Sequence, residues 1–180
     1  MKSSREIEEI CRKYRIKNYT INEDGSIDVN GDVDLIDKKL IELPLNFNRV
    51  NGDFNCSHNY LTELKGCPKY VGNYFSCSYN YLTSLEYSPK YVKGSFNCDS
   101  NKITDLYGIS DYIGNYLYCD GGAPIGIIIN VPVDIDFVRA FNSYRVIKDG
   151  KVILKRLKYV METFDMDYDL EKIKKHYEII

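Results

Sequence analysis

A repeat of 21 residues, running from Leu40 to residue 122, constrains this chain more than any other feature. Residues 61–81 read LTELKGCPKYVGNYFSCSYNY, and the blocks at 40–60, 82–102 and 103–123 carry the same pattern. Self-similarity at such a period is typical of solenoids, in which each unit buries its apolar face against its neighbours. Four apolar positions recur in phase, namely Leu43, Leu64, Leu85 and Leu106; Val50, Val71, Val92 and Ile113; Phe54, Phe75, Phe96 and Leu117; and Cys56, Cys77, Cys98 and Cys119.

The length and charge of the chain limit the kinds of protein and partner that it can represent. A chain of 180 residues is long enough for one domain with an adequate core. Its 24 basic and 26 acidic side chains give a net charge of −2 without a block of like charge, which disfavours a nucleic-acid partner. No apolar run approaches the roughly 18 to 20 residues that span a bilayer, and the N-terminus is charged where a signal peptide is apolar. We therefore expect a cytoplasmic protein without a membrane partner.

The cysteines are predicted to pack in the core rather than to bind a metal or take part in catalysis. Four of the six occupy an interior repeat position, where a thiol serves as a small apolar residue, and we expect all six to be reduced. A thiolate metal site is the alternative, since neighbouring strands lie about 5 Å apart. Thiols in a dry stack have a raised pKa, however, and the sequence gives these no charge partner. Strand alternation also points Cys56 inward and leaves His58 at a turn. We expect no catalytic residue, no metal site and no cofactor.

The segments before and after the repeats are predicted to cap the solenoid. In residues 1–31, a Ser3–Glu6 capping box precedes a helix over 4–15, and short strands are expected at 19–21, 27–29 and 33–35. Turn signals at 24–25 and 30–31 favour an antiparallel hairpin or meander. Such caps are needed because the open end of a solenoid exposes core and unpaired strand groups.

Residues 123–180 are predicted to form the second cap. Asp134 or Asp136 is expected to begin a helix, Asp149-Gly150 the turn of a hairpin, and residues 155–164 a second helix, with a short last helix starting near Asp169. The whole chain is thus expected to be a single domain over 1–180, with its repeats at 32–122.

The repeat unit has a recognisable pattern. Its core reads F-x-C-x-x-N-x-L-x-x-L, which matches the leucine-rich-repeat form with Phe and Cys in the strand positions. Asn59, Asn80 and Asn101 are expected to form a ladder that satisfies buried backbone groups at the turn after each strand. The predicted fold class is therefore an α/β repeat of the leucine-rich type.

The chain resembles the short leucine-rich-repeat proteins encoded by tailed bacteriophages and some bacteria. Residues 16–35, units such as 67–85 and the closing 141–157 carry this resemblance. It implies a curved solenoid with a parallel sheet on the concave side and irregular turns on the convex side. The repeats are also similar to those of secreted bacterial effectors, some of which carry a ubiquitin-ligase domain, for which the last 58 residues are too few.

Strand alternation predicts which side chains line the concave face. Inward Phe and Cys residues force their neighbours outward, and tyrosine is favoured in binding surfaces because its ring has few rotors to freeze. A second band, at Tyr70, Tyr91 and Tyr112, is expected to seal the convex side. The predicted partner-binding residues are Asp53, Asn55, Tyr74, Ser76, Ser95, Asn97, Tyr116, Tyr118 and Asp120.

These features favour a non-enzymatic protein-binding module that docks a host or viral protein on its concave face. The resemblance implies the host cytoplasm as its location and interference with a host process or defence as its role. The alternative is a structural or assembly protein that self-associates through the final strand or the hairpin around Asp149-Gly150. An enzyme with its site in the C-terminal segment is a third interpretation. Its titratable residues, such as Asp136, Arg139 and Arg145, show no pattern that marks them as catalytic.

Overall fold

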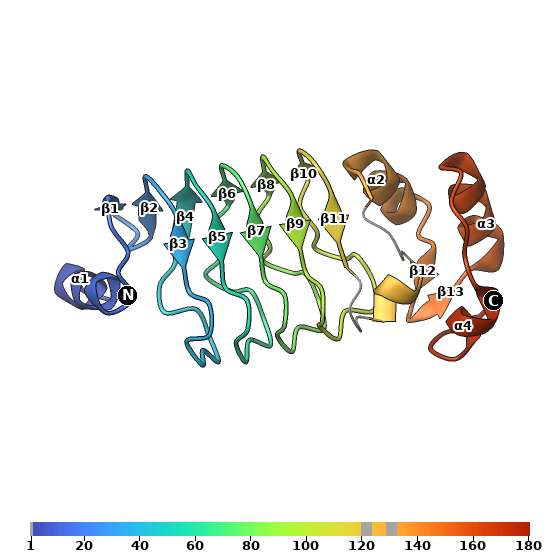
Figure 1. Cartoon of the computed structure of the whole chain (residues 1–180), viewed down its shortest axis with the longest axis horizontal. Helices are drawn as coiled ribbons and strands as arrows, with labels where there is room; N and C mark the ends of the chain where they lie inside the picture. The colour runs from blue at the N-terminus through green and yellow to red at the C-terminus, as the bar shows by residue number, and fades with distance from the viewer. Residues whose placement is uncertain (1, 120–123, 129–132) are drawn as a thin grey trace.

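The computed structural model describes residues 2–119, 124–128 and 133–180. Figure 1 shows a row of stacked coils, with helix α1 (Ser4–Lys13) at one end and helices α2 (Ile135–Ser143), α3 (Leu154–Thr163) and α4 (Leu170–Lys174) at the other. The fold is a solenoid of about four turns with the expected period of 21 residues.

Each coil contributes strands to two sheets, in which the strands pair in parallel except for β1 with β2. In sheet A the strand order is β1-β2-β4-β6-β8-β10, and in sheet B it is β11-β9-β7-β5-β3. Sheet A consists of β1 (Tyr19–Ile21), β2 (Ile27–Val29), β4 (Phe47–Val50), β6 (Tyr70–Val71), β8 (Tyr91–Val92) and β10 (Tyr112–Ile113). Sheet B consists of β3 (Val33–Asp34), β5 (Phe54–Asn55), β7 (Phe75–Ser76), β9 (Phe96–Asn97) and β11 (Leu117–Tyr118).

The second sheet corrects the expectation of irregular structure opposite a single parallel sheet. Tyr70 pairs with Tyr91 and Val71 with Val92, so the same residue types lie side by side in successive coils. Aromatic and β-branched residues suit a pleated, half-buried surface, and their recurrence in phase is what extends the second ladder. The resemblance therefore led us to expect too little regular structure in each coil.

A sharp corner joins the two sheets in every coil. At Gly72 a Cβ atom would overlap the Asn51 carbonyl oxygen of the preceding coil, and at Gly114 it would overlap the Lys93 carbonyl oxygen. Glycine is required there because the backbones approach closely. The turn predicted at 30–31 is the first of these corners. Strand β3 joins sheet B and leaves β1 and β2 as a simple antiparallel hairpin, so the meander is wrong.

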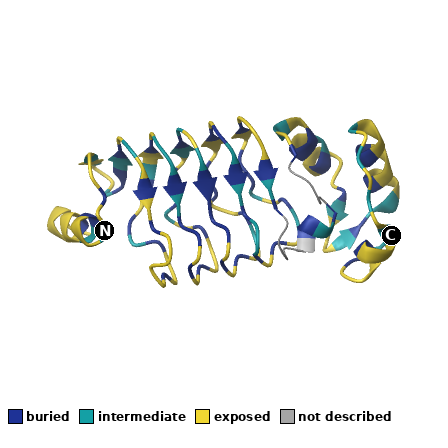
Figure 2. Cartoon of the chain, viewed as in Figure 1, coloured by how far each residue is buried: buried dark blue, intermediate teal, exposed yellow. Residues whose placement is uncertain are grey.

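The core follows the predicted inward positions. Phe54, Phe75 and Phe96 are completely buried and pack as a column, with ring centroids 5.9 and 4.7 Å apart. Figure 2 shows the buried residues running through the strands, while exposed residues gather in the turns and on the outer sides of the helices. The cysteine column is buried as well.

The predicted asparagine ladder is present. The Asn80 Oδ1 atom accepts from the Leu61 amide at 2.9 Å, and its Nδ2 group donates to the Cys56 and Cys77 carbonyls at 3.0 Å. Asn59 and Asn101 repeat this arrangement one coil away on either side. Each asparagine thus joins its own coil to the preceding one, which is why all three are buried.

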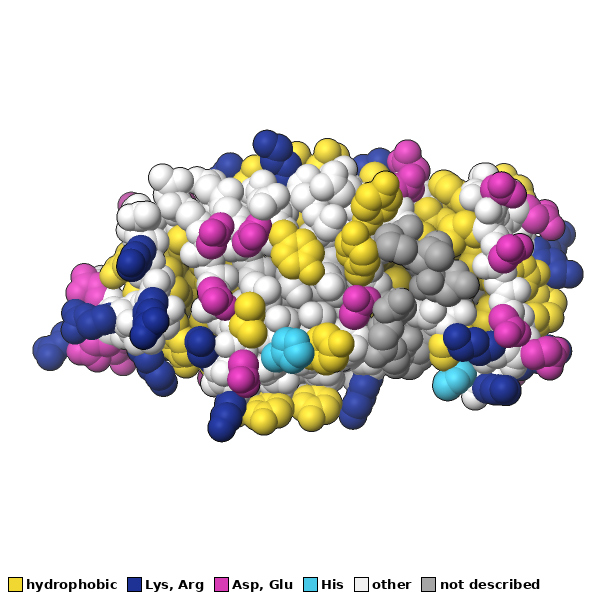
Figure 3. Space-filling view, in the orientation of Figure 1, with side chains coloured by type: hydrophobic (Ala, Val, Ile, Leu, Met, Phe, Trp, Pro, Cys, Tyr) yellow, Lys and Arg dark blue, Asp and Glu magenta, His cyan; other side chains and the backbone are white. Residues whose placement is uncertain are grey.

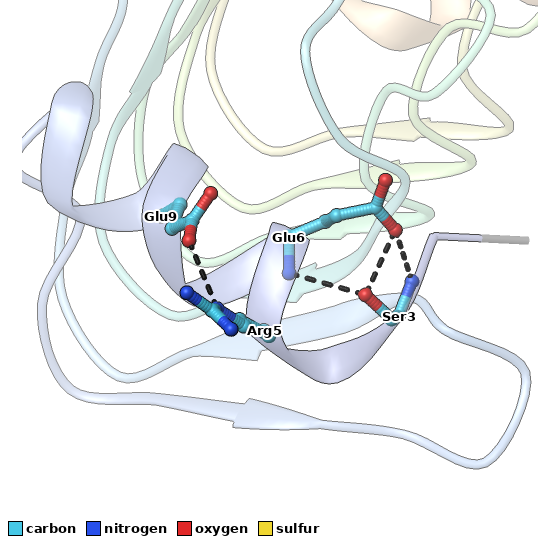
Figure 4. Close-up of polar contacts among 4 residues, drawn as sticks. All are labelled: Ser3, Arg5, Glu6 and Glu9. Atoms are coloured by element: carbon cyan, nitrogen blue, oxygen red, sulfur yellow. Dashed lines mark hydrogen bonds and ion pairs between the residues drawn. The ribbon is translucent and has the colours of Figure 1, made fainter.

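The N-terminal helix begins as its sequence predicts. The Ser3 hydroxyl accepts from the Glu6 amide, and the Glu6 carboxylate accepts from the Ser3 amide at 2.7 Å (Figure 4). An exposed Arg5–Glu9 ion pair lies one turn further along. Helix α1 buries Ile7 and Cys11 and ends at Lys13, two residues before the predicted end.

The C-terminal segment is bonded to the last coil. Asp134 is the N-cap of α2, and the Tyr177 hydroxyl donates to the Thr104 carbonyl at 2.7 Å. The predicted hairpin turn at Asp149-Gly150 joins β12 (Ile147–Lys148) to β13 (Lys151–Val152). A strand that the sequence did not predict, β14 (Glu178–Ile179), pairs in parallel with β13. The segment also includes a 3₁₀ helix, η1 (Pro124–Ile127).

Candidate binding surface

The predicted partner-binding residues form two columns on the outward side of sheet B, the side that faces the viewer in Figure 1. In-register pairing of the strands places residues one repeat apart side by side. The first column contains Asp53, Tyr74, Ser95 and Tyr116, and the second contains Asn55, Ser76, Asn97 and Tyr118. Asp120 lies outside the described residues.

Several polar groups in these columns hold the coils in shape. The Asp53 carboxylate accepts from the Tyr74 amide at 3.0 Å, across one coil step. The Asn55 Oδ1 atom accepts from the Ser57 amide at 3.0 Å, and Asn97 accepts likewise from the Asp99 amide at 2.9 Å. Asn55 and Asn97 therefore build the turns that leave β5 and β9, a common use of short polar residues.

The exposure of the side chains in these columns also differs from what strand alternation predicts. Ser76 was expected to be exposed, but only 2% of it is, and its hydroxyl lies 3.1 Å from that of Ser78. A hydroxymethyl group rises little above the backbone, and the larger Asn55 and Asn97 flank it on the neighbouring strands. Among the predicted tyrosine anchors, Tyr116 is exposed, whereas Tyr74 and Tyr118 are half-buried.

A groove of about 610 Å³ lies beside these columns, where the chain leaves sheet B. Two stacked aromatic pairs form its walls. The His58 and Tyr79 rings lie 4.3 Å apart, and the Tyr60 and Tyr81 rings lie 6.1 Å apart. The groove is lined by Ile36, Asp37, His58, Asn59, Tyr60, Tyr79, Asn80, Tyr81 and Ser100.

Backbone conformation explains why these side chains project into the groove. His58 and Tyr79 have φ angles of 55° and 52°, in the left-handed region, and Asp37 and Ser100 repeat this one coil away on either side. The left-handed residue turns the chain out of sheet B, so that the following asparagine points inward. Asn59 and Asn80 consequently lie between the aromatic pairs. We did not predict this groove, although the recurrence of aromatic residues at 58 and 79 and at 60 and 81 is visible in the sequence.

A second aromatic row lies on the outward side of sheet A. The Tyr70 and Tyr91 rings are 5.1 Å apart, the Tyr91 and Tyr112 rings 4.4 Å apart, and the Arg49 guanidinium covers Tyr70 at 3.7 Å. We call Arg49, Tyr70, Tyr91 and Tyr112 the tyrosine row. These rings were expected to seal the convex side. Tyr91 and Tyr112 are 36% and 37% exposed, so the row is a surface feature.

The thiols lie away from both surfaces. Burial, followed by the neighbouring thiols, raises the pKa of Cys67, Cys77 and Cys98 well above the usual range. Cys56 is buried while His58 is exposed and stacked on Tyr79, so the sequence neighbours do not form a pair. Among the described residues, no group of three or more His, Cys, Asp or Glu side chains is arranged to hold a metal ion.

Charge is divided between the two outward faces. Carboxylates at Asp32, Asp34, Asp53 and Asp99 lie along sheet B, and Figure 3 shows acidic side chains spread among hydrophobic ones, a class that includes tyrosine, on this side. Sheet A carries Arg49 with Lys69, Lys90 and Lys93 at or beside its strands, along with Asp28 in β2 and Asp111 before β10. The two faces therefore suit partners of different charge.

No protein-family model matches this chain, and no curated protein or solved structure does either. Within the residues that the structure describes, no helix is both long enough and apolar enough to cross a membrane.

Proposed function

We propose that this solenoid is of the leucine-rich-repeat type and binds an extended segment of another protein along sheet B and the adjoining groove, without catalysis. The observation that carries the proposal is the groove itself, because two pairs of aromatic rings flank it beside a face rich in polar side chains. Aromatic anchors next to polar groups are characteristic of protein-binding surfaces.

The position of sheet B supports the repeat type. Strands β5, β7 and β9 begin at the Phe position of the motif and end one residue before the Cys position, and the asparagine ladder follows where leucine-rich repeats carry asparagine. Under this proposal the two terminal segments act as caps. The resemblance to phage proteins supports a host or viral protein as the partner, met in the host cytoplasm, with interference in a host process or defence as the role.

Peptide selection followed by mutation tests the proposal. A yeast-displayed library of random octapeptides is selected against the purified protein, and enriched peptides are measured by fluorescence anisotropy. Replacing both Tyr60 and Tyr81 by serine should weaken binding about tenfold or more, since a hot-spot truncation costs at least 1 to 2 kcal/mol. Tyr116→Ser should also weaken it.

The matched control replaces Tyr87 and Tyr107, which are 54% and 70% exposed and lie outside the groove. This variant loses two surface tyrosines but should keep wild-type affinity. Equal loss in the control and groove variants, or failure to enrich any peptide, would refute the proposal.

Self-association is the second candidate, and one observation favours it. Strand β12 lies at the edge of the three-stranded sheet β12-β13-β14, so one side of it is open to pairing with another chain. Sedimentation velocity over a hundredfold dilution should then show a concentration-dependent dimer, which Ile147→Pro would abolish. A monomer throughout would eliminate this candidate.

A further inference from the structure

The tyrosine row presents ring edges rather than ring faces. Neighbouring rings are nearly parallel, with interplanar angles of 8°, and the Arg49 guanidinium covers the first face of Tyr70. Most faces are therefore occupied within the row. The outward parts are the edges and hydroxyl groups, and the edge of an aromatic ring carries the positive part of its quadrupole.

The Tyr91 hydroxyl keeps its proton. Burial, followed by the charge of the neighbouring Tyr112 hydroxyl and a hydrogen bond with it, raises the pKa of Tyr91 above its usual value, so this group stays protonated at any physiological pH. A protonated phenol can donate a hydrogen bond to a carboxylate. The row therefore combines hydrogen-bond donors with a surface that favours negative charge.

Lysines flank the row on two sides. The Lys90 amide bonds to the Lys69 carbonyl at 2.9 Å, so these two residues lie one coil apart beside Tyr70 and Tyr91. Lys93 lies on the other side of Tyr91, at the corner. In the described part of the chain, none of the three lysines is within 4 Å of a carboxylate oxygen.

Three carboxylates lie near this region. Asp28 pairs with Arg49 across sheet A, and its Oδ1 atom accepts from Asn22 and Asn48. Asp24 is near enough for Lys69 to contribute to its lowered pKa, after the larger effect of its hydrogen bonds to Ser26. Asp111 follows Lys90 one coil later. These three carboxylates are fewer than the four cations Arg49, Lys69, Lys90 and Lys93, so the row keeps a small excess of positive charge.

We propose that the tyrosine row and its lysines form a second binding surface, which takes an extended acidic peptide segment through its carboxylates. The segment would lie across the strands, along the solenoid axis. Three inter-strand steps span about 14 Å, enough for about four residues of an extended chain. The carboxylates would bond to the lysine ammonium groups and the tyrosine hydroxyls.

Other occupants fit less well. Single-stranded nucleic acid binds by stacking its bases on aromatic faces, which this row has already used. The Arg49 guanidinium covers Tyr70, and its Nε group donates to Asn51 at 2.7 Å, so one of the two donors in the Nε–Nη fork that grips phosphate is already used. A second copy of the chain needs about 800 Å² on each partner, whereas the row covers roughly 200 Å².

The test uses fluorescein-labelled hexaglutamate and fluorescence anisotropy at low and physiological salt. The double variant Lys69→Glu, Lys90→Glu should weaken binding at least tenfold. Tyr91→Ser should weaken it several-fold, and Tyr91→Phe, which keeps the ring and removes the hydroxyl, should fall between Tyr91→Ser and the wild type. The control Lys155→Glu, Lys158→Glu makes the same change in net charge on exposed positions of α3 and should bind within twofold of wild type.

Each contrary result overturns the proposal. Equal weakening in the control would show that net charge alone attracts the peptide. Tighter binding of hexathymidylate than of hexaglutamate, lost in the Lys69 and Lys90 variant, would assign the row to nucleic acid. A dimer of the free protein that the same variant dissociates would assign it to a second copy. Circular dichroism melting of every variant separates these outcomes from unfolding.

Discussion

The inward and outward sides of sheet B are built from the same strands, yet they vary differently from coil to coil. Inward, Phe54, Phe75 and Phe96 repeat without change and are fully buried. Outward, the positions beside them read Asp53, Tyr74 and Ser95. Inward residues pack against their own copies above and below, so one residue type suits every coil. Outward residues bond to the local turn or to the backbone of the next coil, and otherwise face solvent or a partner.

On the outward side of sheet A, residues repeat because they stack on one another, and not because they are buried. Tyr70, Tyr91 and Tyr112 repeat although they are partly exposed, and they stack on one another at 5.1 and 4.4 Å. Repetition therefore marks contact between copies, whether that contact is buried or not. Variation marks positions at which like side chains do not stack on one another, although Asp53 still bonds to the backbone of the next coil. A partner that recognises particular side chains would contact the protein at these variable positions.

The largest effect is expected from truncating an inward ring. Phe75→Ala should lower the free energy of unfolding by about 3 to 5 kcal/mol, because the ring lies between Phe54 and Phe96 and leaves a cavity. Ser95→Ala, on the outward side of the next coil, should change it by less than about 0.5 kcal/mol. Urea denaturation measures both. Comparable losses would mean that the inward and outward sides are wrongly assigned.

Alkaline pH should destabilise the inward side. Burial raises the pKa of Cys77 and Cys98 in the folded state, so above the ordinary thiol pKa the unfolded chain loses protons that the folded chain keeps. Stability is then fully present below about pH 8.5 and falls as pH rises, by up to about 1.4 kcal/mol per unit for each such thiol. Thermal melting from pH 7 to 10 measures this, and Cys77→Ala should show a shallower slope. An unchanged slope would mean that this thiol is solvated.

The asparagine ladder should come next in size. Asn80→Ala removes the partner of the Leu61 amide and of the Cys56 and Cys77 carbonyls, and should cost about 1 to 3 kcal/mol. Asn115→Ala, at an exposed corner position, is the control and should be nearly neutral. Differential scanning calorimetry compares them. A silent Asn80→Ala would mean that water replaces the side chain.

Sequence patterns predicted the inward side better than the outward side. Packing between copies requires the same residue type at the same position of each repeat. Residues that recur in phase therefore predict the period, the Phe and Cys columns and the asparagine ladder. The second sheet was missed because Tyr-Val pairs are only two residues long and fall outside the leucine-rich pattern. The groove was missed because it depends on a left-handed backbone conformation at His58 and Tyr79, and neither histidine nor tyrosine predicts that conformation.

The smallest predicted effect separates the alternation rule from the observed surface. Alternation alone makes Ser76→Ala nearly silent, since the side chain points outward. In the structure Ser76 is buried, and its hydroxyl bonds to that of Ser78, so the change should cost about 0.5 to 1.5 kcal/mol in urea denaturation. Ser95→Ala is again the reference.

Position 76 then tells which outward column a partner can use. Asn55 and Asn97 hold the turns of the neighbouring coils as Ser76 holds its own. A measurable cost at Ser76 would mark this whole column as part of the coil, leaving the column of Tyr74 and Tyr116 and the groove to contact the partner. If Ser76→Ala lowers the free energy of unfolding no more than Ser95→Ala does, then Asn55, Ser76 and Asn97 are as available to a partner as the tyrosines are.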